Sequence, residues 1–218
     1  MSFFKVLGNK GLCAVVFPST HIFKVSGAVS RSITSMDAKD RLVWIDMEMT
    51  GLEVQTCHIL EVACVVTSPN LVTIAESPPL IIHQPDQVLN SMNEWCIENH
   101  RKSGLTEASR RSTLSLQEAE HTLLQFLRAH TPQGKCPLAG NSVHYDRQFL
   151  HRYMPQVDSH LHYRIVDVST VKELCRRWLP QVISRAPVKA LNHRALDDIR
   201  ESIQEMRYYR SAVFSSVK

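Results

Sequence analysis

The stretch Leu42-Val43-Trp44-Ile45-Asp46-Met47-Glu48 is an apolar, strand-like run that contains two carboxylates. Side chains alternate across a β-strand, so Asp46 and Glu48 point to the same face. Two neighbouring anions in the middle of a sheet repel one another and are costly to desolvate unless a cation lies between them. The alternative is an exposed edge strand with a solvated acidic face, although the large apolar neighbours favour burial. The run therefore predicts a buried strand that carries a cation site.

Three further β-rich runs follow this strand, at residues 59–67, 71–75 and 80–83, and turn residues separate them. Consecutive strands with short connections are typical of an antiparallel arrangement. We therefore expect a three-stranded antiparallel meander in the first half of the chain.

The second half of the chain alternates between strand and helix patterns. Residues 115–118, Ser-Leu-Gln-Glu, have the form of a capping box, and the apolar residues after them share one helical face. Residues 136–139 and 164–168 are typical of short strands that each lead into a helix, and residues 197–213 predict a closing helix. This order predicts an α/β fold with a mixed sheet flanked by helices. We expect one domain, over residues 37–218, because a chain of 218 residues forms one sizeable core.

The composition is that of a globular protein, with 44% hydrophobic and 21% charged residues. No apolar run approaches the roughly 18 to 20 residues of a membrane-spanning helix, so we expect no membrane association. The first acidic residue is Asp37, and four of the 25 basic residues precede it, so the remaining 21 equal the 21 acidic residues. A protein that grips a long polyanion usually has a basic stripe. The neutral body predicts that any nucleic-acid partner is short.

Residues 1–36 contain several Ser, Lys, Arg, Phe and Val residues and no acidic residue. This is the composition of a mitochondrial transit peptide, and it predicts a location in the mitochondrial matrix. A secretory signal fits less well because Lys24 follows the apolar stretch, and a disordered tail is the other alternative. An internal start at Met36 would also give a cytosolic form. The six cysteines include no C-x-x-C pair and are expected to be reduced, which suits either compartment.

Two later segments carry further acids. Asp146 lies after a short strand at the start of a helical stretch, where a simple N-terminal helix charge is the alternative. Asp197 and Asp198 follow His193, and either could pair with a neighbouring arginine. With the acids of the first strand, these segments supply four carboxylates and a histidine. Hard oxygen ligands and a base are the components of a two-metal site for Mg²⁺ or Mn²⁺.

These segments resemble the DEDD exonucleases of the histidine subtype, in which an Asp-x-Glu strand, a later Asp and a His-x-Ala-x-x-Asp segment build the site. Longer blocks are similar to the oligoribonuclease family of that superfamily, and the resemblance covers about residues 41–214. The blocks are Trp-Ile-Asp-Met-Glu-Met-Thr-Gly-Leu (44–52), Pro-Leu-Ala-Gly-Asn-Ser-Val (137–143), Tyr-Arg-Ile-Val-Asp-Val-Ser-Thr-Val-Lys-Glu-Leu (163–174) and His-Arg-Ala-Leu-Asp-Asp-Ile-Arg-Glu-Ser-Ile (193–203).

The resemblance implies a ribonuclease H-like fold and a metal-dependent 3′-to-5′ exoribonuclease. Such an enzyme degrades very short oligonucleotides, especially dinucleotides, to 5′-mononucleotides. The family spacing selects Asp198 rather than Asp197 as the fourth carboxylate. The implied ligands of two Mg²⁺ or Mn²⁺ ions are Asp46, Glu48, Asp146 and Asp198. His193 would take the proton from the attacking water, whereas a lone histidine would otherwise be an ordinary surface residue.

The resemblance also implies how a short substrate is recognised. Leu52 and Trp95 would wedge against and stack on the bases, although Trp95 alone is equally compatible with the core. Tyr163 would reach the site of a neighbouring subunit, so a homodimer is expected. The residues that would close over the 5′ phosphate of a dinucleotide, through charge-assisted hydrogen bonds, are His100, Ser142 and Arg164.

Two other functions remain open for this sequence. Another DEDD exonuclease, such as a DNA proofreading enzyme, would share the metal ligands. A non-catalytic RNA-binding module could keep the fold, but the sequence contains all five catalytic residues. The residues implied in substrate recognition and the absence of a basic track favour the oligoribonuclease family.

Overall fold

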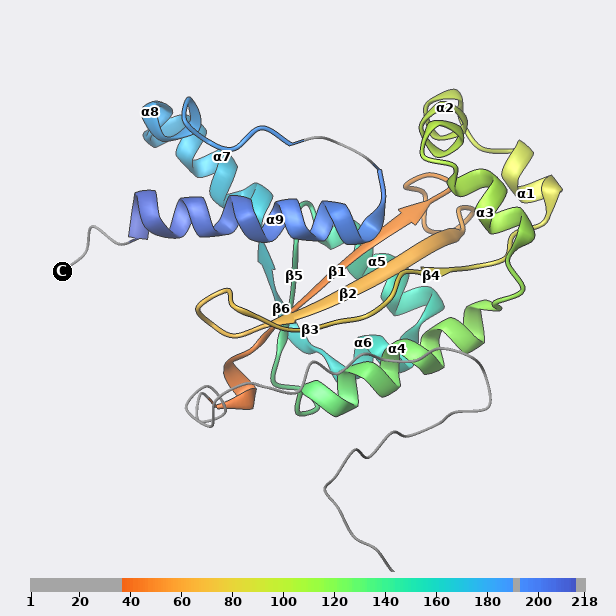
Figure 1. Ribbon diagram of the computed structural model, residues 1–218, viewed down its shortest axis with the longest axis horizontal. Helices are drawn as coiled ribbons and strands as arrows, with labels where there is room; N and C mark the ends of the chain where they lie inside the picture. The colour runs from red at the N-terminus through yellow and green to blue at the C-terminus, as the bar shows by residue number, and fades with distance from the viewer. Residues whose placement is uncertain (1–36, 190–192, 215–218) are drawn as a thin grey trace, which may run out of the picture.

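The computed structural model describes residues 37–189 and 193–214 (Figure 1). The predicted transit peptide at residues 1–36 and the internal start at Met36 lie outside the described residues. In the part of the chain that the structure describes, no helix is long and apolar enough to cross a membrane.

The described residues form a six-stranded mixed sheet with the order β3-β2-β1-β5-β6, and β4 also pairs with β2. The strands are β1 (Leu42–Met49), β2 (Ile59–Thr67), β3 (Thr73–Glu76), β4 (Leu80–Ile81), β5 (Pro137–Gly140) and β6 (His162–Asp167). β1, β2 and β3 are antiparallel, whereas β5 is parallel to β1 and β6 is parallel to β5. The predicted α/β sheet, with a three-stranded meander and parallel strands, is confirmed.

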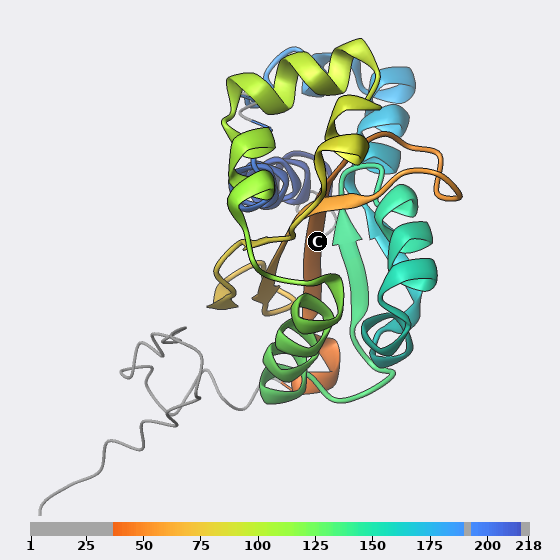
Figure 2. The same cartoon turned by 90° about the vertical axis from the view of Figure 1, so that its right-hand side faces the viewer.

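Helices surround this sheet, with a single turn of 3₁₀-helix at Ala38–Asp40 before it and a π-helical turn at Arg210–Phe214 after it. The helices are α1 (Asp86–Asn90), α2 (Glu94–Lys102), α3 (Leu105–Arg111), α4 (Leu116–His130), α5 (His144–Tyr153), α6 (Pro155–His160), α7 (Val168–Trp178), α8 (Pro180–Ile183) and α9 (Ala195–Tyr209). α9 lies on one side of the sheet and α5 on the other (Figure 2).

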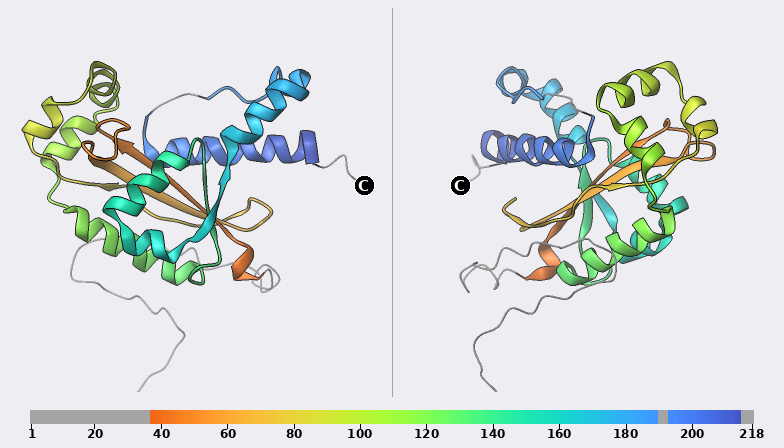
Figure 3. Two further views of the ribbon diagram at one scale, coloured as in Figure 1. Left: turned by 180° about the vertical axis from the view of Figure 1, so that it is seen from behind. Right: turned by 45° about the vertical axis from the view of Figure 1, so that its right-hand side comes forward.

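The alternation of side chains in β1 divides the core between these two layers. Val43, Ile45 and Met47 pack with residues of α4, α5 and α6 in one buried cluster. Trp44 points to the opposite face and packs with residues of α7 and α9 in a second cluster. Figure 3 shows α4, α5 and α6 together on the face away from α9. Asp46 and Glu48 have the same alternation as Trp44, so β1 directs both acids toward the α9 layer.

The capping box predicted the start of α4 correctly, whereas the start of β3 differs from the prediction. The capping box that opens α4 is present: the Ser115 hydroxyl accepts from the Glu118 N–H at 3.2 Å, and the Ser115 N–H donates to Glu118 Oε2 at 2.9 Å. The run expected at residues 71–75 begins only at Thr73. Leu71 lies instead in a turn, with a left-handed φ of 64°, and its N–H donates to the Ser68 carbonyl at 2.9 Å.

The short helices α1, α2 and α3 follow the meander and cover the end of the sheet to which β1 points (Figure 1). They enclose a third, smaller apolar cluster that includes Leu60 of β2, Leu89, Cys96 and Leu105. The sequence patterns did not predict these helices. Their position matters, because the carboxyl end of β1 carries Glu48 and opens toward them.

Candidate active site

Asp46 and Glu48 lie on the α9 face of β1, beyond the buried Trp44 ring. Trp44 is held in place by its indole N–H, which donates to Thr67 Oγ1 of β2 at 2.9 Å. In the register of the antiparallel pair, Asp46 lies opposite Ala63 and Glu48 lies opposite Glu61. The strand therefore carries its two carboxylates side by side toward α9, as the alternation of side chains predicts.

Asp146 reaches the same region from α5, although that helix covers the other face of the sheet. Its side chain is buried, and its Oδ1 accepts the Met47 N–H at 3.0 Å. Met47 lies between the two acids of β1. This hydrogen bond places the Asp146 carboxylate beside the β1 backbone, which a simple helix-end charge would not require.

Asp198 and His193 come from the start of α9. Single ligand atoms of Glu48, His193 and Asp198 all lie within 4.8 Å of one another. The neighbouring Asp197 is different: its side chain is 46% exposed, and its Oδ1 lies 3.5 Å from Arg200 Nη1. The structure thus brings Asp198, not Asp197, to the acids of β1.

Burial and mutual repulsion perturb the proton affinities of these acids. Burial raises the pKa of Glu48 to about 8, with added repulsion from Asp198 and Glu61. Burial also raises the pKa of Asp146 to about 8, against hydrogen bonds that lower it. The pKa of Asp46 rises through burial and the charges of Asp146 and Glu48. Burial likewise raises the pKa of Asp198.

Four buried or half-buried acids with raised pKa values favour either protons or a multivalent cation in the space among them. Carboxylate oxygens are the ligands that Mg²⁺ and Mn²⁺ prefer. The donor set therefore fits divalent metal ions.

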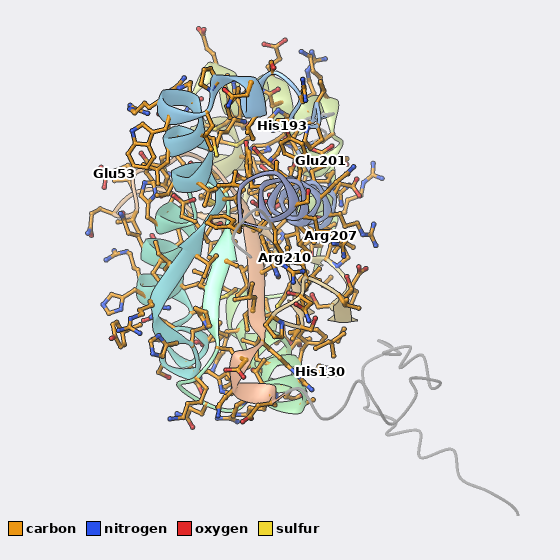
Figure 4. All side chains as sticks on the ribbon, turned by 90° about the vertical axis from the view of Figure 1, so that its left-hand side faces the viewer. Glu53, His130, His193, Glu201, Arg207 and Arg210 are labelled. Carbon is orange, nitrogen blue, oxygen red and sulfur yellow. The ribbon has the colours of Figure 1, made fainter. Side chains whose placement is uncertain are left out.

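His193 has an unusual backbone conformation and an aromatic neighbour. Its φ of 50° lies in the left-handed region, which non-glycine residues seldom adopt. Its ring meets the Trp95 ring edge-on, with centroids 5.2 Å apart and an interplanar angle of 83°. Figure 4 views α9 end-on and shows His193 beyond the helix, on the side of α2.

A pocket of about 440 Å³ opens beside this cluster, between the end of β1 and α2. Glu48, Leu52, Trp95 and His100 are among its lining residues. Leu52 is 56% exposed and Trp95 is 58% exposed, so Trp95 is not a core residue. Two large apolar side chains that face solvent next to a carboxylate cluster form a surface on which flat aromatic groups can stack.

His100 lies at the buried side of this pocket. Its Nε2 lies 2.9 Å from the Met49 carbonyl oxygen, so Nε2 carries the proton and donates it. Its Nδ1 lies 3.7 Å from Glu48 Oε2 and has no hydrogen-bond partner among the described residues. Burial lowers the pKa of His100. Burial thus disfavours the charged imidazole, and the contact with Met49 supports the end of β1.

The other three residues predicted to hold the substrate lie near β5 and β6. Ser142 follows β5, and its N–H donates to Asp167 Oδ1 at 2.8 Å and to Ser169 Oγ at 3.0 Å. Tyr163 and Arg164 lie on β6, which ends the order of the sheet, and the Arg164 guanidinium lies 5.2 Å from the centroid of the Tyr163 ring. Among the described residues, no hydrogen bond, ion pair or ring contact joins these three to Leu52 or Trp95.

Sequence reasoning missed two charged residues near the acids. Glu61 is fully buried on β2 and pairs with Arg194, the residue after His193. Lys189 pairs with Glu205 at 2.9 Å, and its charge lowers the pKa of both Asp46 and Asp198. A glutamate inside the apolar run of residues 59–67 was a signal for the first of these.

Comparison with known sequences identifies the class of this protein. Residues 43–206 match the model of the exonuclease family, and the chain belongs to that family. "Oligoribonuclease, mitochondrial" of Homo sapiens is 59% identical over 80% of this chain and 73% of the human protein. "Probable oligoribonuclease" of Drosophila melanogaster is 44% identical over 89% of this chain and 98% of the fly protein. Within the exonucleases, the chain belongs to the oligoribonuclease family.

Solved structures show the same fold. The zinc-bound complex of E. coli exonuclease I with single-stranded DNA aligns with a TM-score of 0.63 and 15% sequence identity. The alignment covers 81% of this chain but only 42% of the exonuclease I chain. At this identity the likeness concerns the fold alone, and it agrees with the ribonuclease H-like sheet expected from the sequence.

Proposed function

We propose that this protein is a 3′-to-5′ exoribonuclease that degrades very short oligonucleotides, especially dinucleotides, to 5′-mononucleotides. The observation that carries the proposal is the meeting of Glu48, Asp198 and His193 within 4.8 Å beside a pocket with exposed Leu52 and Trp95. Membership of the oligoribonuclease family supports the same substrate class. A non-catalytic module would have no need to bury so many acids together.

Asp46, Glu48, Asp146 and Asp198 would hold two divalent ions, Mg²⁺ or Mn²⁺. Bound there, the ions would polarise the scissile phosphate and lower the pKa of a bound water. The chain itself supplies the negative charge that binds them, in a setting where burial makes each unneutralised carboxylate costly. The raised pKa values of Glu48 and Asp146 support this assignment.

His193 is assigned as the general base that takes the proton from the attacking water. Its imidazole lies within reach of both Glu48 and Asp198, so a proton acceptor stands beside the ligands. The edge-on contact with Trp95 restricts the orientation of the ring. At the same position His193 could instead be a metal ligand. The two roles predict different results when the His193 side chain is removed: metal binding persists if it is a general base and weakens if it is a ligand.

Leu52 and Trp95 would hold the bases of a short RNA by wedging and stacking, which tolerates any sequence because every base has a flat face. His100, Ser142 and Arg164 are assigned to the 5′ phosphate. The balanced charge of residues 37–218 supports a short substrate over a long one. This set separates the proposal from a DNA proofreading exonuclease with the same metal ligands.

A homodimer would bring Tyr163 of one subunit to the site of the other. Tyr163 is 73% exposed on β6, which is an edge strand of the sheet formed by the described residues. Ile165 of β6 and two residues of α7, Leu174 and Trp178, are also exposed apolar side chains. Apolar area of this kind is typical of a contact surface between proteins, which supports the dimer.

We assign the protein to the mitochondrial matrix. The animal relative named above is described as mitochondrial, and residues 1–36 have the composition of a transit peptide. The cytosolic form from an internal start at Met36 stays a prediction. A fluorescent fusion to residues 1–36 that remained in the cytosol would contradict the matrix assignment.

The central test is to incubate the purified protein with Mn²⁺ and 5′-phosphorylated RNAs of two, five and twenty nucleotides. We expect the dinucleotide to be cut fastest and the longest RNA slowest, with 5′-mononucleotides as products. Equal rates on all three RNAs would contradict a pocket closed around a short substrate. Release of products from the 5′ end would contradict the direction of degradation.

A further inference from the structure

Glu61 is a fully buried carboxylate that the proposed reaction does not use. It lies on β2, directly opposite Glu48 in the β1–β2 register, with an exposure of 0%. A buried carboxylate next to a second carboxylate is destabilising unless strong partners offset both desolvation and repulsion. An apolar residue would fill this position at lower cost, so the partners of Glu61 indicate why an acid stands there.

Those partners are donors from one short segment, the residues that follow His193. Arg194 Nη2 donates to Glu61 Oε1 at 2.7 Å, and Arg194 Nε donates to Oε2 at 3.1 Å. The Ala195 N–H donates to Oε2 at 3.2 Å. The bidentate contact fixes the plane of the guanidinium as well as its position. The backbone contact fixes the first residue of α9.

His193 immediately precedes this anchored segment, and Asp198 lies in the first turn after it. The left-handed φ of 50° at His193 is a sparsely populated conformation for a residue with a Cβ. Such conformations persist only where the surroundings determine the backbone. Glu61 supplies those surroundings through contacts on the next two residues.

We propose that Glu61 is a positioning residue. Through Arg194 and the Ala195 N–H, it holds the backbone of His193 and the start of α9 so that the His193 imidazole and the Asp198 carboxylate meet Glu48. This inference rests on the proposed function, because it assigns Glu61 a purpose in that reaction. Glu61 touches no reacting atom itself.

A second ion pair between the sheet and α9 provides a matched control. Arg200 Nη2 lies 2.7 Å from Glu76 Oε2 of β3, one to two turns further along the helix than Arg194. Both partners of this pair are partly exposed, so the pair is expected to stabilise the fold little. It links the same two layers as Glu61 and Arg194, but without a neighbour in the acidic cluster.

The experiment compares Glu61→Gln, Arg194→Lys and Glu76→Gln with the wild-type protein. Gln keeps the shape of Glu61 but offers one acceptor oxygen, and Lys keeps the charge of Arg194 but not its fork of donors. The kcat and KM on a 5′-phosphorylated dinucleotide with Mn²⁺ are measured for each variant. Loss of a residue that orients metal ligands typically lowers activity by about 10- to 100-fold. We expect that loss in kcat, with KM little changed, for Glu61→Gln and Arg194→Lys, which are called the clamp variants. Glu76→Gln should retain wild-type kcat.

Hydrogen–deuterium exchange of the metal-free proteins gives a readout independent of catalysis. We expect faster exchange in Glu61→Gln and Arg194→Lys at the start of α9, in peptides over residues 193–199, and unchanged exchange in β1 and β5. Wild-type kcat in both clamp variants, or faster exchange throughout the sheet, would overturn the positioning role. If the wild-type protein cleaved no dinucleotide, the proposed function would fail, whereas the exchange result would still report on the clamp.

Discussion

The two halves of the predicted site are built in different ways. Asp46, Glu48, Asp146, Asp198 and His193 come from β1, α5 and the start of α9, and the fold of one chain brings them together. Tyr163 and Arg164 lie on the exposed edge strand β6, away from the residues they are expected to serve. The difference predicts that one subunit holds every residue proposed to bind metal, whereas recognition of a short substrate requires a second subunit.

The largest effect should come from the acidic half, which consists of the four carboxylates and His193. We expect Asp198→Asn to lower kcat by about 10⁴-fold, equivalent to about 5 kcal/mol, because it removes a ligand charge from a metal centre worth several kcal/mol. Asp197→Asn should stay near the wild-type rate, because Asp197 points to Arg200. Steady-state cleavage of a dinucleotide measures both. Full activity in Asp198→Asn would show that the fourth ligand is another residue.

A smaller loss of kcat is expected from a substitution of His193, which should show whether this residue acts as a general base or as a metal ligand. His193→Asn should lower kcat by about 10²- to 10³-fold, within the usual contribution of a general base, while Mn²⁺ binding persists. Isothermal titration calorimetry with Mn²⁺, in the presence of a dinucleotide, measures the binding. His151→Asn is the control, because His151 is exposed and pairs with Asp158. Loss of Mn²⁺ binding in His193→Asn would identify His193 as a ligand instead.

The shared face of Asp46 and Glu48 was predictable because its signal is local, whereas the meeting of Asp146, Asp198 and His193 with β1 was expected from the family resemblance. The spacing of Asp46 and Glu48 defines a shared face of β1, and the burial of the neighbouring apolar residues follows from composition. The choice between Asp197 and Asp198 came from family spacing, and the geometry agrees with it. The fold was predictable for the same reason: β1, β2 and the capped start of α4 are strong local patterns.

Long-range pairing was not predictable from local patterns. Glu61 and Arg194 lie 133 positions apart, and neither residue carries a motif that points to the other. The helices α1 to α3 are short and mostly stabilised by packing on the sheet, so their periodicity is weak. The exposure of Trp95 likewise depends on how α2 lies over the end of β1. Tertiary contacts decide each of these features.

The edge half consists of Tyr163 and Arg164 on β6. Mixed subunits can test whether these residues act at the site of the neighbouring subunit. Tyr163→Ala should lower dinucleotide cleavage by about 10-fold, a loss of one stacked aromatic contact worth about 1–3 kcal/mol. In a mixture with excess Asp198→Asn subunits, activity should recover, because a hybrid dimer contains one site with intact acids and an intact tyrosine from the partner. Activity of the mixture is compared with that of each variant alone. No recovery, with heterodimers detected by native mass spectrometry, would contradict a shared site.

The smallest effect concerns the stability of the metal-free protein. Burial raises the pKa of Glu48 and of Asp146 to about 8, so the folded state holds protons that the unfolded state releases near pH 4. Where the folded state binds more protons, the free energy of unfolding falls as pH rises. The stabilisation from these protons is therefore present at low pH and is lost as pH rises through about 8. Metal ions should restore it at high pH.

Thermal melting between pH 7 and 9 isolates this effect. Burial lowers the pKa of His100, His130 and His160, so the stability they add with rising pH is complete by about pH 7. We expect the melting temperature of the metal-free protein to fall over this range, by about 2–4 °C for each kcal/mol lost. Glu48→Gln cannot ionise and should show a shallower fall, whereas Glu53→Gln, at an exposed position outside the cluster, should follow the wild type (Figure 4). A melting temperature that stays level or rises from pH 7 to 9 in the metal-free wild type would mean that Glu48 and Asp146 do not hold protons in the folded state at neutral pH, and that burial does not make their charges costly.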